Sequence, residues 1–360
     1  MLRTEIAARR LFAQHLTGEP FGSPVEVVRW LGAVQSQDYG GAKWALALRS
    51  RGTTDVELDR LFDQGIILRT HVLRPTWHFV LPDDLRWLLE LTGPRVRRGL
   101  AGRHHQLEID ARVIERAETA WAAALAGGRS LTRSELGQVL AMTGVSPEGQ
   151  RLPHLLMVAE LDGLLTSGPR RGKQFTYALL EERAPGQLRL DRSAALVELT
   201  RRFFRSRGPA QVQDFVWWSG VTAADARAGI AAAGAALDHL VVEGKHYWFD
   251  AQASRPPSAD STAHLLPNFD EYVVAYRDRT ALYANGPFDL TRFSFGSILS
   301  NVLMVGGLVR GSWRRTTGPG GLRLVIRPLE PLERAEQRAV EATGRRLADF
   351  LGKPVQLAWQ

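Results

Sequence analysis

Cysteine is absent from the 360 residues of this chain. Its absence excludes disulfide bonds, thiolate metal clusters and a cysteine nucleophile, so a zinc site would need histidine and carboxylate ligands. Long hydrophobic runs are also missing, because no stretch reaches the ~18 consecutive apolar residues of a membrane-spanning helix. The first ten residues carry polar side chains throughout and lack the apolar segment of a secretory signal. We therefore expect a cytoplasmic protein without membrane contact.

Acidic residues are outnumbered by basic ones, with 38 Asp and Glu against 46 Lys and Arg, a formal net charge of +8 and a pI near 10.2. This excess favours a polyanionic partner, because phosphates attract Arg and Lys and release counterions on binding. An Arg-rich composition can also follow from genomic base bias, so the placement of the charge matters more than its sum. The length allows two to four domains with well-filled cores.

Helix starts are marked by four capping boxes, in which a Ser or Thr oxygen accepts a free amide of the first turn and an acid three residues later completes the motif. Each box predicts a short helix, and a proline at the first helical position strengthens the first of them. The boxes are Ser23-Pro24-Val25-Glu26, Thr54-Asp55-Val56-Glu57, Thr132-Arg133-Ser134-Glu135 and Thr222-Ala223-Ala224-Asp225.

The clearest structural unit spans residues 130–180. Helices are predicted over 133–140 and about 150–164, and strands over 164–167 and 174–179 follow them. The strands are joined by the basic, turn-rich segment 168–173. Two helices followed by a hairpin with a basic tip is the order of a winged helix. The alternative is a generic α+β insertion whose Arg-rich loop is simply solvated.

The same order of elements recurs twice. Helices are expected near 5–16, 24–34 and 55–64 before strands over 66–69 and 77–80, and again over 192–205, 212–218 and 223–233 before strands over 240–243 and 246–249. Beyond a linker at 254–263, short strands over 302–305, 308–313 and 322–326 predict a small sheet or barrel. A helix over 333–351 and a strand over 355–359 end the chain.

These patterns predict an α+β fold with three tandem winged-helix domains and a C-terminal domain built on a small β-barrel or sheet. The expected domains are a first winged helix with the glutamine motif and a helical extension, a second and a third winged helix, and the C-terminal domain with one helix. Their ranges are 1–128, 129–185, 186–252 and 262–360.

Basic side chains gather in four short stretches. A single such stretch is as often a solvated surface as a binding site, but four of them in a chain of winged helices favour a nucleic acid partner. The candidate DNA-binding residues are Arg95, Arg97, Arg98 and Arg103, then Arg170, Arg171 and Lys173 at the hairpin tip, and Arg201, Arg202 and Arg205. A fourth group is formed by Arg310, Arg314 and Arg315.

Two glutamines at a spacing of two, Gln35 and Gln37, follow the helix that begins after Ser23. Their side chains point the same way only if the backbone is extended, because on a helix they would diverge by about 200°. Gly40 and Gly41 argue against a helix here, so we expect an extended segment that aims both amides at one site. The ordinary role of such a pair is to satisfy backbone groups, and spacing alone does not separate this role from catalysis.

Three motifs together resemble the AlkZ-like family of winged-helix DNA glycosylases, nearly over the whole chain and in the family's order. They are Gln35-Ser36-Gln37-Asp38-Tyr39 with Lys43-Trp44-Ala45, then Arg69-Thr70-His71-Val72-Leu73-Arg74-Pro75-Thr76-Trp77-His78-Phe79-Val80, and Leu265-Leu266-Pro267-Asn268-Phe269-Asp270-Glu271-Tyr272. The resemblance implies three winged helices and a barrel in a C-shaped, basic DNA cradle. It also implies removal of N7-alkylguanine by a Gln-aliphatic-Gln motif, without full flipping of the base.

Carried onto this chain, the motif makes Gln35 and Gln37 the catalytic residues. Ser36 departs from the aliphatic preference, and a middle residue should face away from the pair, so we expect little effect on catalysis. Members with broader substrates have Asp at the last position, so Gln37 implies the narrower range. N7-alkylguanine is already cationic and leaves without a general acid, so two amide oxygens suffice to stabilise a sugar cation and hold the attacking water.

Several neighbouring residues have competing interpretations. Asp38, His71, Arg74 and His78 are possible supporting residues, although Asp38 fits the scaffold better and buried histidines are more often simply packed and hydrogen-bonded. Asp270 and Glu271 invite a paired-carboxylate hypothesis. Adjacent residues of a strand face opposite sides, so we expect salt bridges at a domain junction instead.

The sequence thus predicts a monofunctional DNA glycosylase, active in repair or in self-resistance to a genotoxic natural product. Its expected partner is double-stranded DNA carrying alkylated guanine, including bulky adducts and possible interstrand crosslinks. We expect a monomer at the nucleoid that needs no metal and no cofactor. The alternative is a non-catalytic winged-helix regulator, since this module more often binds than catalyses. No coiled-coil heptad or effector domain is evident in the sequence, which counts against a regulator.

Overall fold

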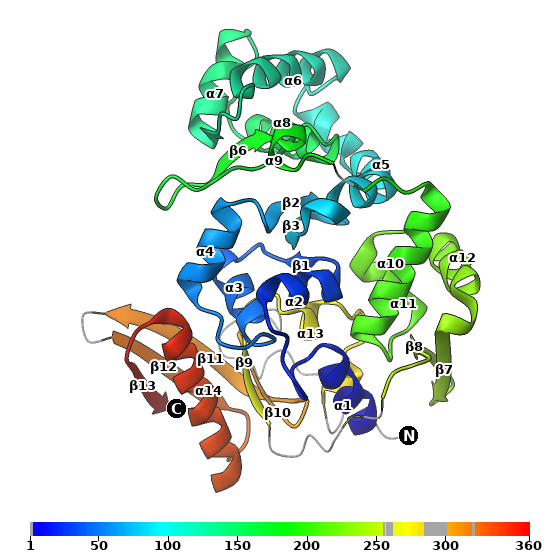
Figure 1. The fold of residues 1–360 in the computed structure, drawn as a ribbon, viewed down its shortest axis with the longest axis vertical. Coiled ribbons are helices and arrows are strands. Elements are labelled where there is room, and N and C mark those ends of the chain that lie inside the picture. Colours follow the sequence, from blue (N-terminus) through cyan, green and yellow to red (C-terminus); the bar gives the residue numbers. More distant parts are fainter. Residues whose placement is uncertain (1–2, 187, 255, 257–261, 284–300, 319–320) are drawn as a thin grey trace. The chain divides into compact units, whose positions relative to one another are not determined.

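The protein is described by a computed structural model that covers residues 3–186, 188–254, 256, 262–283, 301–318 and 321–360. The chain divides into two compact units (Figure 1). Unit 1 takes residues 1–58, 197–218 and 222–360, and unit 2 takes residues 59–196 and 219–221. Both units are discontinuous in sequence, whereas the four expected domains are consecutive ranges; those ranges stay a prediction. Part of the expected linker at 254–263 lies outside the described residues.

Unit 1 contains the N-terminal helices and the last third of the chain. Two of its helices, α4 (Asp55–Asp63) and α10 (Arg192–Arg207), have several residues in unit 2, and α11 (Val212–Ser219) has its last residue there. Its other helices are α1 (Arg3–Ala13), α2 (Pro24–Leu31), α3 (Tyr39–Ala47), α12 (Ala223–Ala233), α13 (Glu271–Val274) and α14 (Arg334–Leu351), with short 3-10 turns η1 (Gly234–Ala236) and η2 (Thr280–Leu282). Its strands are β1 (Val34–Gln35), β7 (Leu237–Val242), β8 (Lys245–Asp250), β9 (Ala263–Leu266), β10 (Val302–Val305), β11 (Leu308–Gly318), β12 (Gly321–Pro328) and β13 (Val355–Trp359).

The C-terminal strands form one sheet in the order β13-β12-β11-β10-β9. All neighbours are antiparallel except β12 and β13, which are parallel. Helix α14 lies along this sheet (Figure 1), and its Gly344 leaves room for Leu324 and Leu357. The three short strands, the helix and the last strand were expected, and they are present. Of the two expected forms, a small sheet or a barrel, the described strands form an open sheet, because β9 and β13 each pair with one neighbour only and not with each other. The barrel is not confirmed.

Unit 2 is built around a three-stranded sheet in the order β4-β6-β5 and also contains a hairpin. The hairpin joins β2 (Leu68–Val72) to β3 (Arg74–Val80) in antiparallel register. The other elements are α5 (Pro82–Gln106), α6 (Ala111–Leu125), β4 (Leu131–Thr132), α7 (Arg133–Met142), α8 (Arg151–Leu161), β5 (Leu165–Ser167), β6 (Thr176–Leu179) and α9 (Leu180–Arg183). The helix, helix, hairpin order expected over 130–180 is present, while its assignment as a winged helix stays a prediction.

Local capping chemistry accounts for where several helices begin. The boxes at Ser23, Thr132 and Thr222 are complete, with the side chain and the acid bonded to each other's backbone amides. At Thr54 the hydroxyl accepts the amide of Glu57 at 3.2 Å. These helices were predictable because each cap needs only residues within one turn.

The core of unit 2 is centred on the face of α6 that carries Trp121 and Leu125. These side chains pack against Leu136 and Leu140 of α7 and against leucines of α8. The indole nitrogen of Trp121 donates to the carbonyl of Leu136 at 3.0 Å, so its one polar group is satisfied inside the core. Among the described residues, no helix is both long and apolar enough to cross a bilayer.

Candidate active site around Gln35

The two glutamines differ in their surroundings. Gln35 ends the short strand β1, as expected for an extended segment, and is only 6% exposed. Ser36 is fully buried, and Gln37 is exposed at a bend. The backbone is therefore extended at Gln35 and turns before Asp38. That both amides face one site stays a prediction.

Asp38 caps a helix that the sequence analysis missed. Its side chain accepts the amide of Gly41 at 3.0 Å and starts α3. The prediction that Gly40 and Gly41 oppose a helix is wrong, because both lie in the first turn of α3. Gly41 is needed there, since a Cβ at this position would lie 2.9 Å from an Asp38 carboxylate oxygen. Asp38 is thus part of the scaffold, and an Asp before a run of apolar residues is the signal that could have revealed the helix.

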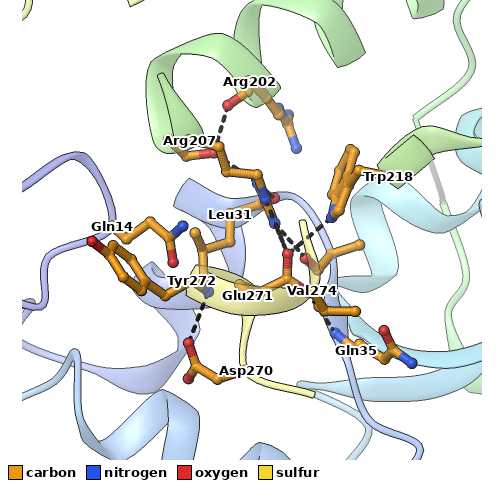
Figure 2. A network of polar contacts seen from close by, with 12 residues as sticks. Gln14, Leu31, Gln35, Arg202, Arg207, Trp218, Asp270, Glu271, Tyr272 and Val274 are labelled. Carbon is orange, nitrogen blue, oxygen red and sulfur yellow. Dashed lines mark hydrogen bonds and ion pairs between the residues drawn. The ribbon is translucent and has the colours of Figure 1, made fainter. Parts of the chain in front are cut away.

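Glu271 holds the strand that carries Gln35. Its Oε1 accepts the backbone amide of Gln35 at 2.9 Å, while its Oε2 accepts two bonds from Arg207, at 2.6 and 3.0 Å, and one from Trp218 Nε1 at 2.9 Å. Figure 2 shows the side-chain amide of Gln35 extending away from this carboxylate. Glu271 is completely buried, so it acts on the backbone and is shielded from a DNA substrate.

Arg207 completes the same network from the end of α10. Its guanidinium is fully buried, lies 4.1 Å from the ring centre of Trp218, and donates to the carbonyls of Leu31 at 2.8 Å and Ala33 at 3.0 Å. Burial lowers the pKa of Arg207, and the carboxylate of Glu271 opposes this effect. A buried ion pair with all its hydrogen bonds made is costly to break from either side. The segment before Gln35 is therefore held at three backbone groups.

A second buried ion pair lies beside the first. Arg49 makes two bonds to Asp270, at 2.8 and 2.9 Å, and also donates to the backbone and side chain of Gln14. Asp270 caps α13 through the amide of Tyr272. The expected ion pairs at Asp270 and Glu271 are thus confirmed. The expected strand at this point is wrong, because the two residues cap and begin a short helix.

Two cations lie close to the glutamine motif in unit 1. Gly40 makes room for the guanidinium of Arg315 from β11, whose Nη2 would lie 3.3 Å from a Cβ at this position. Lys43 is 4% exposed, and its Nζ forms an ion pair with Asp55 at 2.7 Å. The sequence analysis assigned Arg315 to a basic group but did not connect it with the glutamine motif. The contact between Arg315 and Gly40 joins segments that are far apart in the chain, so the sequence does not reveal it.

The two candidate histidines lie on the hairpin of unit 2. Both are packed and hydrogen-bonded, which is the commoner state of a buried histidine. His71 is 5% exposed and its Nδ1 hydrogen-bonds the buried carboxylate of Glu160. His78 is fully buried and its Nδ1 donates to the carbonyl of Thr76 at 2.9 Å. Arg74 is half-buried at the hairpin turn. Among the described residues, no three acidic or histidine side chains are grouped to hold a metal ion.

The four expected DNA contacts on α5 fall into two kinds. Arg95 and Arg98 are exposed and make no hydrogen bond or ion pair with a described residue. Arg97 forms a two-pronged ion pair with Asp162, and Arg103 donates to Gln150 at 2.6 and 3.1 Å. The charges of Arg95 and Arg98 are therefore available to phosphates without breaking an internal contact.

The hairpin tip shows the same division. Arg170 is tied to α4 by ion pairs with Asp59 at 2.9 Å and Asp63 at 3.5 Å. Arg171 reaches Glu135 at 2.7 Å, and the amide of Thr132 together with Arg171 lowers the pKa of that carboxyl to about 2. Lys173 is exposed and forms no such contact with the described part of the chain. Only Lys173 at this tip carries a charge that the fold does not use.

The third expected cluster lies on α10. Arg202 pairs with Glu198 at 2.6 Å, while Arg201 is exposed. Arg205 is half-buried, with its guanidinium 4.5 Å from the ring centre of Trp30. These side chains line a pocket in unit 1 together with α1 and β8.

Comparisons with known proteins agree with this architecture. The model of a family described as DNA glycosylase AlkZ-like matches residues 28–350. Among solved structures, the DNA glycosylase AlkZ of Streptomyces sahachiroi is similar to this chain, with a TM-score of 0.82, 22% identity, and coverage of 99% of this chain and 100% of that chain. At that identity the likeness shows a shared fold. A search of curated proteins finds no match.

Proposed function

Because this chain belongs to the AlkZ-like family of DNA glycosylases, we propose that it hydrolyses the N-glycosidic bond of cationic N7-alkylguanine in double-stranded DNA. Gln35 and Gln37 are the residues that we assign to the reaction. The lesions include bulky adducts and interstrand crosslinks, and the role is DNA repair or self-resistance to a genotoxic natural product, carried out by a monomer at the nucleoid.

The chemistry needs no titratable catalyst. The bond between C1′ of the sugar and N9 of the base breaks, and the cationic base leaves as neutral 7-alkylguanine. Water adds to C1′ and gives up one proton to solvent. Amide oxygens of Gln35 and Gln37 stabilise the positive charge that develops on the sugar and orient the water. Unmodified guanine is a poor leaving group and is spared, because neither amide can donate the proton it would need.

The observation that carries this proposal is the bond from the Gln35 amide to Glu271. Catalysis by a neutral amide depends on placement, because its partial charge is small and a displacement of 1 Å can cost ~100-fold in rate. Arg207 and Trp218 fix Glu271, and Arg207 also fixes the carbonyls of Leu31 and Ala33. A network of this kind around a strand of two residues supports a role that needs a rigid backbone.

Two further contacts support the details of the proposal. A bifunctional glycosylase needs a free amine nucleophile, and the lysine nearest the motif in sequence, Lys43, is buried in an ion pair with Asp55. A single hydrolytic activity is the simpler assignment. Arg315 beside Gly40 supplies a cation for a phosphate next to the motif, and Arg95, Arg98 and Lys173 supply exposed cations in unit 2.

The test uses duplex DNA that carries one defined N7-alkylguanine. Wild-type protein should release the base and leave an abasic site in an unbroken strand, and borohydride should trap no protein on the DNA. Gln35→Ala and Gln37→Ala should each lower the single-turnover rate about 100-fold or more, as the loss of one preorganised dipole does elsewhere. Gln356→Ala, an exposed glutamine of β13, is the matched control and should keep the wild-type rate.

Each part of the proposal has its own contrary result. If both glutamine variants keep the wild-type rate, the glutamines take no part in the mechanism. If wild type releases no cationic adduct yet binds the duplex, the substrate assignment is wrong and a DNA-binding role gains support. A borohydride-trapped complex would show an amine nucleophile and contradict the monofunctional assignment.

A further inference from the structure

A cavity of about 530 Å³ lies within unit 1, apart from the glutamine motif. Its lining comes from α1, α2, α10 and β8 and includes neither Gln35 nor Gln37. Cavities of 300–1,000 Å³ are typical of sites for small molecules. Two kinds of side chain dominate the walls, which are arginines and aromatic rings. The residues that matter here are Arg9, Trp30, Arg201, Arg202, Arg205 and Phe249.

Two of the arginines form no direct ion pair within the described part of the chain. Arg201 and Arg205 are one turn apart on α10, and neither makes a hydrogen bond or ion pair with a described residue. The Nε of Arg205 is buried without a hydrogen-bond partner. Burial and the charges of Arg202 and Arg201 lower the pKa of Arg205, while the carboxylates of Glu198 and Asp250 raise it. Like charges at this spacing disfavour the folded chain, and an anion between them would remove that penalty.

The acidic residues of the cavity do not supply this anion. Glu198 is bonded to Arg202 at 2.6 Å. Asp250 accepts the backbone amide of Gln252 at 2.8 Å. Both carboxylates have a nearer partner than Arg205 and offset its charge only from a distance. The lining holds four arginines against these two acids, so the cavity keeps an excess of positive charge.

The aromatic walls are held in place by the backbone. The amide of Trp248 donates to the carbonyl of Ala210 at 2.8 Å, and the amide of Ala210 donates to the carbonyl of Trp248 at 2.9 Å. These bonds bring β8 against the end of α10. Gly208 permits this approach, since a Cβ there would lie 2.8 Å from Cα of Phe249. As a result Phe249 faces the cavity, with the guanidinium of Arg9 5.4 Å from its ring centre.

We propose that this cavity binds a phosphorylated nucleoside, with its phosphate on Arg201 and Arg205 and its base against Trp30 and Phe249. The planar guanidinium fork matches the oxygens of a phosphate, and aromatic side chains stack on nucleobases. The nucleotide can be free or can be the 5′ end of a DNA strand, because both present the same phosphate and base. A recessed cavity walled by aromatic rings and arginines fits one nucleotide better than the continuous backbone of a duplex, whose phosphates need contacts on an open surface.

The experiment measures binding to the full-length protein by calorimetry. The probes are dGMP, deoxyguanosine, inorganic phosphate, and an oligonucleotide with or without a 5′-phosphate. We expect dGMP to bind at one site and deoxyguanosine to show no binding. Arg201→Gln should weaken dGMP about tenfold or more, as expected for losing a charged hydrogen bond. This side chain is exposed and makes no internal bond, so the variant should fold normally. Arg345→Gln, an exposed arginine of α14, should bind like wild type.

The outcomes separate the proposal from its rivals. Tighter binding of the 5′-phosphorylated oligonucleotide than of dGMP, lost in Arg201→Gln, would identify a strand end as the source and support the site. Equal binding of inorganic phosphate and dGMP would contradict the role of the aromatic walls and overturn the proposal. An absence of dGMP binding would also overturn the proposal. If Arg201→Gln in that case weakened the binding of duplex DNA, the two arginines would be part of the DNA-binding surface instead. None of these results depends on base release.

Discussion

The backbone amide of Gln35 donates a hydrogen bond of 2.9 Å to Oε1 of Glu271, which is 236 positions away in the chain. The bond links a strand of two residues to the first residue of a short helix. Because the other oxygen of Glu271 is occupied by Arg207 and Trp218, the strand is attached to a rigid, buried group. The position of the Gln35 side chain is thus set through its backbone, and this relationship leads to the first prediction.

Glu271→Gln should unfold more easily than wild type by about 3–5 kcal/mol, because it leaves the buried guanidinium of Arg207 without its negative partner. Urea denaturation measures the change. Asp349→Asn, an exposed acid on α14, is the control and should stay within ~0.5 kcal/mol of wild type. A loss below about 1 kcal/mol in Glu271→Gln would show that the ion pair contributes little to this fold.

Gln37→Ala should separate chemistry from folding. Gln37 is exposed, so its replacement should change the free energy of unfolding by no more than ~0.5 kcal/mol while base release falls. Gln35 is buried, so Gln35→Ala should lower both the free energy of unfolding and the rate of base release. Parallel denaturation and single-turnover assays test this. A Gln37→Ala protein that is as destabilised as Gln35→Ala would contradict the assignment of Gln37 to the reacting face.

His264 on β9 should make the protein less stable in mild acid. Burial, with the charges of Arg49 and Arg346, lowers the pKa of His264 from 6.5 to about 4. Its contribution is complete above pH 6.5, where both states are neutral. Between pH 6.5 and 4 the unfolded chain takes up a proton that the folded chain excludes, so stability falls, by about 3 kcal/mol in all.

The measurement is the difference in unfolding free energy between His264→Gln and wild type, followed from pH 7.5 to 4. Taking the difference cancels the pH dependence that other titrating groups contribute to both proteins. Glu118 is one such group: its pKa is raised to about 7, chiefly by burial, so it stabilises the folded chain as the pH falls, opposite to His264. His105→Gln, at an exposed position of α5, is the control. If the slope is the same in His264→Gln as in wild type, the buried histidine does not cause it.

Gly208→Ala should destabilise the protein, since the added Cβ would lie 2.4 Å from the carbonyl oxygen of Phe204 and 2.8 Å from Phe249. An overpacked core position of this kind costs about 1–3 kcal/mol. Gly99→Ala in α5 has open space around its Cβ and should stabilise its helix by up to ~1 kcal/mol. Thermal melting of both variants should therefore move in opposite directions, and a Gly208→Ala protein that melts like wild type would show that β8 can shift.

Lys173→Gln should weaken the binding of undamaged duplex DNA by the same factor whatever the DNA sequence. Removing one phosphate contact lowers the slope of log K against log salt by about 0.9. Arg170→Gln should instead reduce stability and leave this slope unchanged, because Arg170 is engaged with Asp59 and Asp63. Binding titrations at several salt concentrations measure both. Equal slopes of log K against log salt for Lys173→Gln and wild type would show that Lys173 does not contact the DNA.

Features that depend on neighbours within one turn could be predicted from the sequence. The boxes at Ser23, Thr132 and Thr222 start helices where expected, and the strand, helix, strand order after residue 300 is present. Helix α3 was missed although its cause is also local. Asp38 accepts a backbone amide without an acid three residues later, and glycine in the first turn disguised the start.

The sequence by itself determined the glutamine motif, the excess of basic charge and the local helix starts, because capping and charge reside in single residues and short segments. Only the tertiary structure decided which charges are already used. It pairs Arg207 with Glu271 and Arg170 with Asp59, and it leaves Arg95, Arg98 and Lys173 exposed. The physical reason is that a buried charge must find a partner wherever the fold places one, and such partners can be 60 to 240 residues apart, as they are around Gln35.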